Sequence, residues 1–184
     1  MRLGDRMLQK WRIRIAAPWI LMGSRVLDIG CHNGEFLQFL GARIVDSIGV
    51  DPLAPSIESE NFTLIRDTFQ PATEFASDSF DAISLLATLE HIKDTRAIAF
   101  ECARILRPAG RVVITIPSPL VDEIIDILIR FRVLDGMSLE EHHGLHPSQL
   151  PDTFQNASFT LLVRRRFQLG LNNLLVFENQ GSSI

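Results

Sequence analysis

The sequence predicts an α/β fold, an open, doubly wound and mostly parallel sheet with helices on both faces. Short and almost continuously apolar runs recur along the chain, which is typical of strands buried on both sides, and stretches with helical spacing separate them. Two further strand-like runs around GLNN favour a closing antiparallel hairpin. The chain has 184 residues, 46% of them hydrophobic and 22% charged, so we expect one globular domain over residues 1–184.

Five strands are expected before residue 118: RVLDIG (25–30), SIGVD (47–51), FTLIRD (62–67), FDAISLL (80–86) and RVVITIP (111–117). Spacing and end signals predict helices at 34–41, near 54–60, near 71–76 and at 94–106. The closing hairpin is expected in FTLLVRRRFQLGLNNLLVFEN (159–179), with its three arginines on a solvated strand edge.

Residues 1–20 are basic and then briefly apolar, as in a secretion signal. The apolar part is short, contains Pro18 and runs directly into the strand at Val26, so we expect an amphipathic N-terminal helix, or lid, and a cytoplasmic protein. No apolar stretch approaches the ~18–20 residues of a membrane span. Cys31 and Cys102 do not suggest a disulfide framework, which agrees with a reducing compartment.

Residues 118–147 are expected to form an insertion on the substrate side. The stretch 121–134 has the pattern of an amphipathic helix that packs on the sheet edge or covers an apolar acceptor, such as a quinone, a polyketide or a lipid-linked sugar. In the EEHHGLHP stretch that follows, His142 and His146 have the i, i+4 spacing of metal ligands. Gly144 and Pro147 argue against a continuous helix there, so we expect no metal site, but a loop that faces substrate or solvent.

The first strand–loop–helix unit is the natural ligand site of such a sheet, because ligands lie over the carboxyl ends of the strands. Gly30 and Gly34 permit a tight turn and a close approach to the next helix, although an ordinary turn would also explain a glycine pair. Three acids, Asp28, Asp51 and Asp67, are expected near this edge. This acidic rim predicts a cationic ligand with a ribose, and S-adenosylmethionine has a ribose, an ammonium and a positive sulfur.

A dinucleotide site is the alternative at this loop. The spacing here is Gly-x-x-x-Gly, and His32 stands where a Gly-x-Gly-x-x-Gly fingerprint needs its second glycine. Asp28 would also repel a pyrophosphate that rests on the helix N-terminus. A nucleotide-linked oxidoreductase is therefore disfavoured.

Four motifs in order, VLDIGCHNG, GVDP, FDAISLLATLEHIKD and ARILRPAGRVVITIP, resemble those of class I S-adenosylmethionine-dependent methyltransferases, in particular the type 11 group of small-molecule enzymes. The resemblance covers about residues 20–117 strongly and the later strands more loosely. It implies a Rossmann-like sheet of about seven strands in the order 3-2-1-4-5-7-6, with the last strand antiparallel.

The resemblance also implies roles around the glycine loop. Gly30, Cys31, His32 and Gly34 would form the loop around the methionine part of the cofactor. Asp28 would order this loop or hold the ammonium through water.

Further cofactor contacts are implied at the ends of the next strands. Asp51 would bind the ribose hydroxyls, Pro52 would pack on the adenine, and Asp67 would accept from the adenine amino group with Phe69 nearby. Carbonyl groups after the fourth strand, at Leu86 and Ala87, would accept from the ammonium.

The sequence departs from the family pattern at two positions. His32 replaces a common glycine and narrows the loop. Ala109 replaces the usual glycine of RPAG; because a Cβ disfavours a positive φ, we expect a type I turn there.

Methyl transfer from a sulfonium is an in-line displacement that requires alignment, and a hydroxyl acceptor also requires a base. His91, in LEHI after the fourth strand, and His143 are the candidate catalytic residues, because histidine exchanges protons near neutral pH. The alternative for His91 is a structural residue that bonds to backbone at a helix start.

We therefore expect a methyltransferase that acts on oxygen or carbon of a small-molecule acceptor, apolar or lipid- or sugar-linked, and that yields S-adenosylhomocysteine. The rival is a non-catalytic S-adenosylmethionine-binding regulatory or accessory protein. A net charge of −4 gives no general attraction to nucleic acid or anionic membrane. The absence of tyrosine excludes an Asp/Asn-Pro-Pro-Tyr amino-methylating site. The acceptor is expected to meet residues 1–20 and 118–147.

Overall fold

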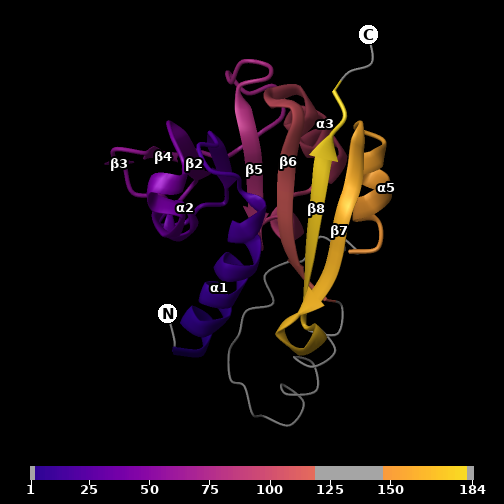
Figure 1. The fold of residues 1–184 in the computed structure, drawn as a ribbon, viewed down its shortest axis with the longest axis horizontal. Coiled ribbons are helices and arrows are strands. Elements are labelled where there is room, and N and C mark those ends of the chain that lie inside the picture. Colours follow the sequence, from indigo (N-terminus) through magenta and orange to yellow (C-terminus); the bar gives the residue numbers. More distant parts are fainter. Residues whose placement is uncertain (1–2, 119–146, 182–184) are drawn as a thin grey trace.

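The computed structural model describes residues 3–118 and 147–181, which form one eight-stranded sheet with helices on both faces (Figure 1). The strand order is β3-β4-β2-β1-β5-β6-β8-β7. The strands are β1 (Val26–Ile29), β2 (Ser47–Asp51), β3 (Ile57–Glu58), β4 (Phe62–Arg66), β5 (Phe80–Leu86), β6 (Leu106–Pro117), β7 (Phe159–Phe167) and β8 (Asn172–Asn179).

The helices divide between the two faces of this sheet. They are α1 (Leu3–Ala16), α2 (Glu35–Leu40), α3 (Thr95–Ile105) and α5 (Leu150–Gln155), with short 3-10 turns η1 (Ala17–Trp19), η2 (Gly41–Arg43), η3 (Leu89–His91) and η4 (Gln168–Gly170). Apolar side chains of α1 and α2 bury one sheet face, and those of α3 and α5 bury the other. Strand residues alternate between these two cores: Val26 of β1 belongs to the first, whereas Leu27 and Ile29 belong to the second.

The predicted fold class and strand order are confirmed. Numbering only the seven predicted strands, their order in the sheet is 3-2-1-4-5-7-6. Strands β4, β2, β1, β5 and β6 run parallel to one another, whereas β8 runs antiparallel to both β6 and β7. The arginine-bearing strand β7 is an edge strand, as expected.

The helix expected near 54–60 is wrong. In its place β3 pairs antiparallel with β4, with Ile57 opposite Leu64, and adds an eighth strand at the edge. The amide of Ser59 donates to the carbonyl of Phe62 at 2.8 Å, which closes a tight hairpin turn. Pro55 just before β3 lacks an amide proton, so it cannot take part in a continuing helical ladder.

Two further local predictions fail. No helix forms near 71–76, where the amide of Thr73 donates to the Glu101 carboxylate of α3. Ala109 adopts a φ of +61°, so the expected type I turn, which needs a negative φ, is wrong. The stretch 121–134 and His142, His143 and His146 lie outside the described residues.

Strand β1 sits at the centre of the switch in strand order, with β2 on one side and β5 on the other. Asp28 lies opposite Gly49 of β2 and Ser84 of β5, so the carboxyl ends of all three strands reach the same edge. The connection from β1 leads to β2 on one side, and the connection from the adjacent β5 leads to β6 on the other. Such a reversal opens a crevice above the strand ends. Among the described residues, no helix is long and apolar enough to cross a membrane.

Candidate functional site

A cavity of about 490 Å³ lies over the carboxyl ends of β1, β2 and β5, beneath α1. Each neighbouring element contributes to it: α1, the loop from β1 into α2, the end of β2, and the segment that leaves β5. The lining residues are Gln9, Arg12, Ile13, Asp28, Gly30, Cys31, His32, Glu35, Phe36, Asp51, Pro52, Leu53, Leu86, Ala87, Thr88 and His91.

Glycine is required at two positions of the β1–α2 loop. Gly30 has a φ of +75°, and a Cβ there would lie 2.3 Å from the Thr88 hydroxyl oxygen. Gly34 also has a φ of +75°, and its Cβ would lie 2.8 Å from Leu64 Cδ1. Both the backbone conformation and the lack of space therefore exclude a side chain.

His32 adopts a left-handed conformation without being glycine, with a φ of +50°. Its amide donates to Asp51 Oδ2 at 3.0 Å, while the amide of Leu53 donates to Asp51 Oδ1 at 2.7 Å. Asp51 therefore joins the glycine loop of β1 to the turn after β2, and its carboxylate lies on the cavity wall.

Asp28 is a buried carboxyl group at the cavity floor, with only 3% of its surface exposed. The Ser84 hydroxyl donates to its Oδ1 at 2.7 Å. Burial raises the pKa of Asp28 to about 7; the bond from Ser84 opposes this shift, and the nearby Glu35 and Asp51 carboxylates increase it. Removing this carboxyl from water is thus poorly compensated by the protein groups around it.

Glu35 is a third acid on the cavity wall, at the start of α2. Its Oε1 lies 3.0 Å from His32 Nδ1, and the Asn33 amide donates to Oε2 at 3.2 Å. Burial alone would raise the pKa of Glu35, but bonds from backbone amide groups, His32 and Gln9 outweigh it and hold the pKa below its ordinary value. Unlike Asp28, this carboxylate is already paired.

The opposite wall carries a guanidinium and a histidine. Arg12 reaches the cavity from α1; burial lowers its pKa, and the Glu90 carboxylate on η3 partly offsets this effect. His91, also on η3, lines the cavity beside Thr88 with an exposed side chain. Arg12 is the only lysine or arginine among the described residues that line this cavity.

Most of the predicted site residues come together at this cavity. Those that line it are Asp28, Gly30, Cys31, His32, Asp51, Pro52, Leu86, Ala87 and His91. Three do not line it. Gly34 is buried below the loop, Phe69 is buried in the core on the α3 side, and Asp67 is exposed after β4, where its amide donates to the Asp51 carbonyl at 3.3 Å.

Sequence reasoning missed Gln9, Arg12, Glu35 and Thr88. Their signals were present but not specific. Gln9 and Arg12 lie on the inner side of α1. The sequence of this helix predicted a basic, amphipathic helix but not which side chains would face a ligand. Glu35 is an acid in the first helical turn, which stabilises many helices. Within residues 3–118 and 147–181, no three His, Cys, Asp or Glu side chains are grouped as a metal site would need.

The sequence profile of a methyltransferase-domain family matches residues 3–170. The chain belongs to the class I S-adenosylmethionine-dependent methyltransferase family. This membership confirms the resemblance inferred from the four motifs, and it implies S-adenosylmethionine as the cofactor.

Sequence relatives of this chain include two ubiquinone biosynthesis O-methyltransferases. The one from Acinetobacter baumannii (strain AYE) is 27% identical over 155 residues, covering 77% of this chain and 65% of the relative. The one from Xanthomonas oryzae pv. oryzae (strain PXO99A) is 32% identical over 164 residues, covering 80% and 67%. The chain thus spans about two thirds of the length of these curated relatives.

Solved structures share the fold at low sequence identity. A chain in the complex between the Haloferax volcanii Trm112 methyltransferase activator and the putative methyltransferase aligns with a TM-score of 0.74 at 13% identity, covering 97% of this chain and 94% of that chain. The PH0226 protein from Pyrococcus horikoshii aligns with a TM-score of 0.72 at 15% identity, covering 97% and 92%.

The donor set of the cavity fits this cofactor. A buried carboxyl with little compensation suits a ligand that carries a positive charge, as the ammonium and sulfonium of S-adenosylmethionine do. The Arg12 guanidinium suits the carboxylate of the same ligand. Because Gly30 has no Cβ, the side chain of Thr88 packs directly on the loop backbone, and both residues line the cavity.

Proposed function

We propose that this protein transfers the methyl group of S-adenosylmethionine to a small-molecule acceptor and releases S-adenosylhomocysteine. The observation that carries the proposal is the Asp28 carboxyl, buried beneath a cavity whose walls add the carboxylates of Glu35 and Asp51. Bound there, S-adenosylmethionine supplies a methyl group that is already activated by its positive sulfur. The protein then needs to align the acceptor and exclude water, and orientation alone can contribute about 7–11 kcal/mol.

The proposed roles follow the positions of the side chains. The loop of Gly30, Cys31, His32 and Gly34, with Asp28 below it, would surround the methionine part. The carbonyl groups of the β5 end, at Leu86 and Ala87, would accept from the ammonium.

The ribose and adenine would lie toward β2 and β4. Asp51 would bind the ribose hydroxyls and Pro52 would pack on the adenine. Asp67 and Phe69 do not line the cavity, so their proposed adenine contacts require the β4 end to approach the ligand when it binds.

We further propose that the acceptor is an apolar molecule with a hydroxyl group. Two observations support oxygen over carbon: relatives are ubiquinone biosynthesis O-methyltransferases, and His91 lines the cavity as a possible base. Support for an apolar acceptor comes from Ile13, Phe36 and Leu53 on the cavity walls. We place the protein in the cytoplasm, since its two cysteines are free and buried.

The first experiment is titration calorimetry with S-adenosylmethionine, S-adenosylhomocysteine and NAD. We expect stoichiometric binding of the two sulfur ligands and none of NAD, because the acidic floor would repel a pyrophosphate. Binding of NAD without either sulfur ligand would overturn the assignment.

Catalysis by a histidine base is tested with His91→Ala and His143→Ala in the presence of an accepted hydroxyl substrate. A base contributes about 10²–10⁴-fold, so turnover should fall by such a factor while cofactor affinity stays nearly unchanged. Unchanged turnover in both variants would reject histidine as the base. Cofactor binding with no turnover on any hydroxylated quinone precursor or phenol would instead favour a non-catalytic S-adenosylmethionine-binding protein.

A further inference from the structure

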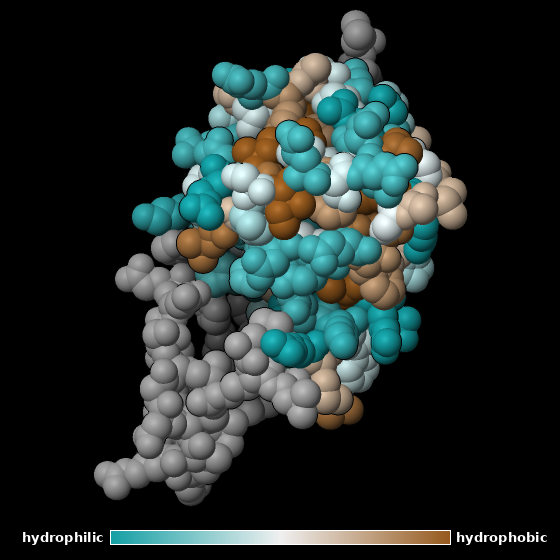
Figure 2. All heavy atoms as spheres, turned by 90° about the vertical axis from the view of Figure 1, so that its left-hand side faces the viewer, coloured by the Kyte–Doolittle hydropathy of each residue, from teal (hydrophilic) through white to brown (hydrophobic). Residues whose placement is uncertain are grey.

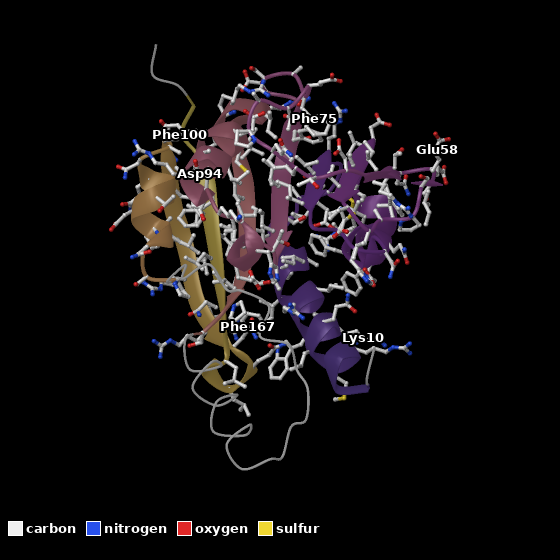
Figure 3. The ribbon with its side chains drawn as sticks, turned by 180° about the vertical axis from the view of Figure 1, so that it is seen from behind. Lys10, Glu58, Phe75, Asp94, Phe100 and Phe167 are labelled. Carbon is white, nitrogen blue, oxygen red and sulfur yellow. The ribbon has the colours of Figure 1, made fainter. Side chains whose placement is uncertain are left out.

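The outer side of α1 combines positive charge with exposed apolar side chains. Arg6, Lys10 and Arg14 follow one another at intervals of four residues and are all exposed, so they form one stripe along the helix. Met7 and Trp11 form the adjacent stripe, with 66% and 46% of their surfaces exposed. Figure 3 shows Lys10 extended away from the sheet.

A groove of about 450 Å³ runs between the stripe of Arg6, Lys10 and Arg14 and helix α2. Lys10 and Arg14 form one lip, while Phe39 of α2, 51% exposed, forms the other. Ile13 lies between them. The groove also contains Glu35, but that carboxylate is paired with the ring of His32. Figure 2 shows the side of the molecule with α2, where brown apolar residues interrupt a mostly teal surface.

We propose that this outer face of α1, with Phe39 of α2, docks on an anionic lipid bilayer. A helix with Lys and Arg on its polar side and Trp and Met beside them is typical of elements that lie in the headgroup region. The occupant is argued from charge: the whole chain carries −4, yet this face presents three cations in one line, which complements anionic headgroups. The net charge of −4 does not describe this face, because the exposed cations Arg6, Lys10 and Arg14 are concentrated on it.

The inner side of α1 lines the ligand cavity, so docking of the outer side would bring this cavity close to the bilayer. Gln9, Arg12 and Ile13 line the ligand cavity, while Lys10, Trp11 and Arg14 do not. A bilayer at the outer face would therefore hold the cavity within one helix diameter, about 10–12 Å, of the headgroup layer. The inference goes beyond the proposed methyl transfer and does not depend on it.

The test is co-sedimentation of the purified protein with neutral phosphatidylcholine vesicles and with vesicles containing about 30% phosphatidylglycerol. We expect binding to the anionic vesicles only, and loss of that binding between about 50 mM and 500 mM NaCl. Each cation at an anionic surface contributes roughly a factor of five, so Lys10→Gln with Arg14→Gln should lower binding about 25-fold.

The matched control is Arg164→Gln with Arg165→Gln on β7, which removes the same charge from exposed positions on another element. It should change vesicle binding less than twofold, since those residues lie outside the proposed face. Trp11 emission should shift to the blue on anionic vesicles, and the shift should vanish in Trp11→Phe, which leaves the half-buried Trp19 unchanged.

Three results would overturn the proposal. They are equal losses in the two double variants, equal binding to neutral and anionic vesicles, and binding to soluble polyglutamate without binding to vesicles. Calorimetry with S-adenosylmethionine on the same variants keeps the two proposals separate, because Lys10 and Arg14 lie outside the cavity lining and cofactor affinity should not change.

Discussion

Two carboxyl groups of this protein are almost equally buried, yet their surroundings differ sharply. Glu101 of α3 is 6% exposed and accepts from the Thr73 amide at 3.0 Å and the Thr73 hydroxyl at 2.6 Å. It also accepts from Arg104 Nε at 3.0 Å and Nη2 at 2.6 Å. Asp28 is 3% exposed and accepts from the Ser84 hydroxyl.

The two pKa values move in opposite directions for this reason. Burial would raise the pKa of Glu101, but the bonds from Arg104 and Thr73 outweigh it and lower the pKa to about 2. Burial raises the pKa of Asp28 to about 7. Burial therefore does not determine the role of a carboxyl. The charge of Glu101 is compensated by groups of the protein itself, and its bonds to Thr73 hold the segment 73–77 against α3. The charge of Asp28 is not compensated in this way, which is typical of a carboxyl that binds a cationic ligand.

The largest effect should come from the compensated acid. Glu101→Gln removes the charge that pairs with Arg104 and accepts hydrogen bonds from Thr73, and should lower the free energy of unfolding by about 2–3 kcal/mol in urea titrations. Asp28→Asn is the control and should not destabilise the unliganded protein at neutral pH, because Asn keeps an acceptor for Ser84 without the buried charge. Equal destabilisation by both changes would remove the distinction between the two acids.

Asp51 is intermediate between these two acids, because its carboxylate accepts from two loop amides and also lines the cavity. Asp51→Asn should weaken S-adenosylmethionine binding tens-fold, about 2 kcal/mol, since the proposed bonds to ribose are charge-assisted. Asp46→Asn is the matched control: Asp46 is exposed at the other end of β2 with a φ of +41°, which Asn tolerates. Equal affinities in calorimetry would show that Asp51 does not hold the ribose.

Asp28→Asn should separate stability from binding. We expect its affinity for S-adenosylmethionine to fall about tenfold, because the cation loses its buried counter-charge. The melting temperature of the unliganded protein should rise at about pH 8, where the wild-type carboxylate is ionised and poorly compensated. A lower melting temperature with unchanged affinity would assign Asp28 a purely structural role.

The free energy of unfolding should depend on the ionisation of both Glu101 and Asp28, and the two contributions should change with pH in opposite directions. The lowered pKa of Glu101 stabilises the fold above about pH 4.5, and this contribution is lost as pH falls toward 2. The raised pKa of Asp28 gives a contribution that is complete below its unfolded pKa near 3.8 and is lost as pH rises through 7. Each slope should not exceed about 1.4 kcal/mol per pH unit. Glu101→Gln should reduce the slope on the acid side, where the lowered pKa of Glu35 also contributes, and leave the slope near neutral pH unchanged. Asp28→Asn should remove the slope near neutral pH and leave the acid side unchanged.

The positions of Asp28 and Asp51 beside the glycine loop could be predicted from the sequence, because parallel strand ends meet at one edge and the glycine loop marks the first strand. The role of Glu101 could not be predicted, because within the expected helix 94–106 this residue shows nothing beyond helical spacing. The partner of Glu101 is Thr73, 28 residues away in a segment expected to be helical, and only the packing of α3 brings the two together.

Dependence on contacts distant in sequence also explains why the two-residue strand β3 and the orientation of helix α1 could not be predicted. The pairing of Ile57 with Leu64 comes from a hairpin turn that contains Ser59 and Asn61 but lacks the Asn-Gly or Asp-Gly pair that marks a hairpin in a sequence. The basic, amphipathic pattern of α1 predicted a helix but did not show which side meets the cavity, because that depends on packing against β6.

The most direct test of the account is the number of protons released when S-adenosylmethionine binds. Calorimetry at about pH 6, in two buffers with different ionisation enthalpies, gives this number from the difference in observed heat. With a pKa of about 7, Asp28 is mostly protonated in the free protein at that pH and must ionise beside a cationic ligand. We predict that wild type releases close to one proton and that Asp28→Asn releases almost none. Equal proton release by the two proteins would contradict the claim that Asp28 is the counter-charge of the cofactor.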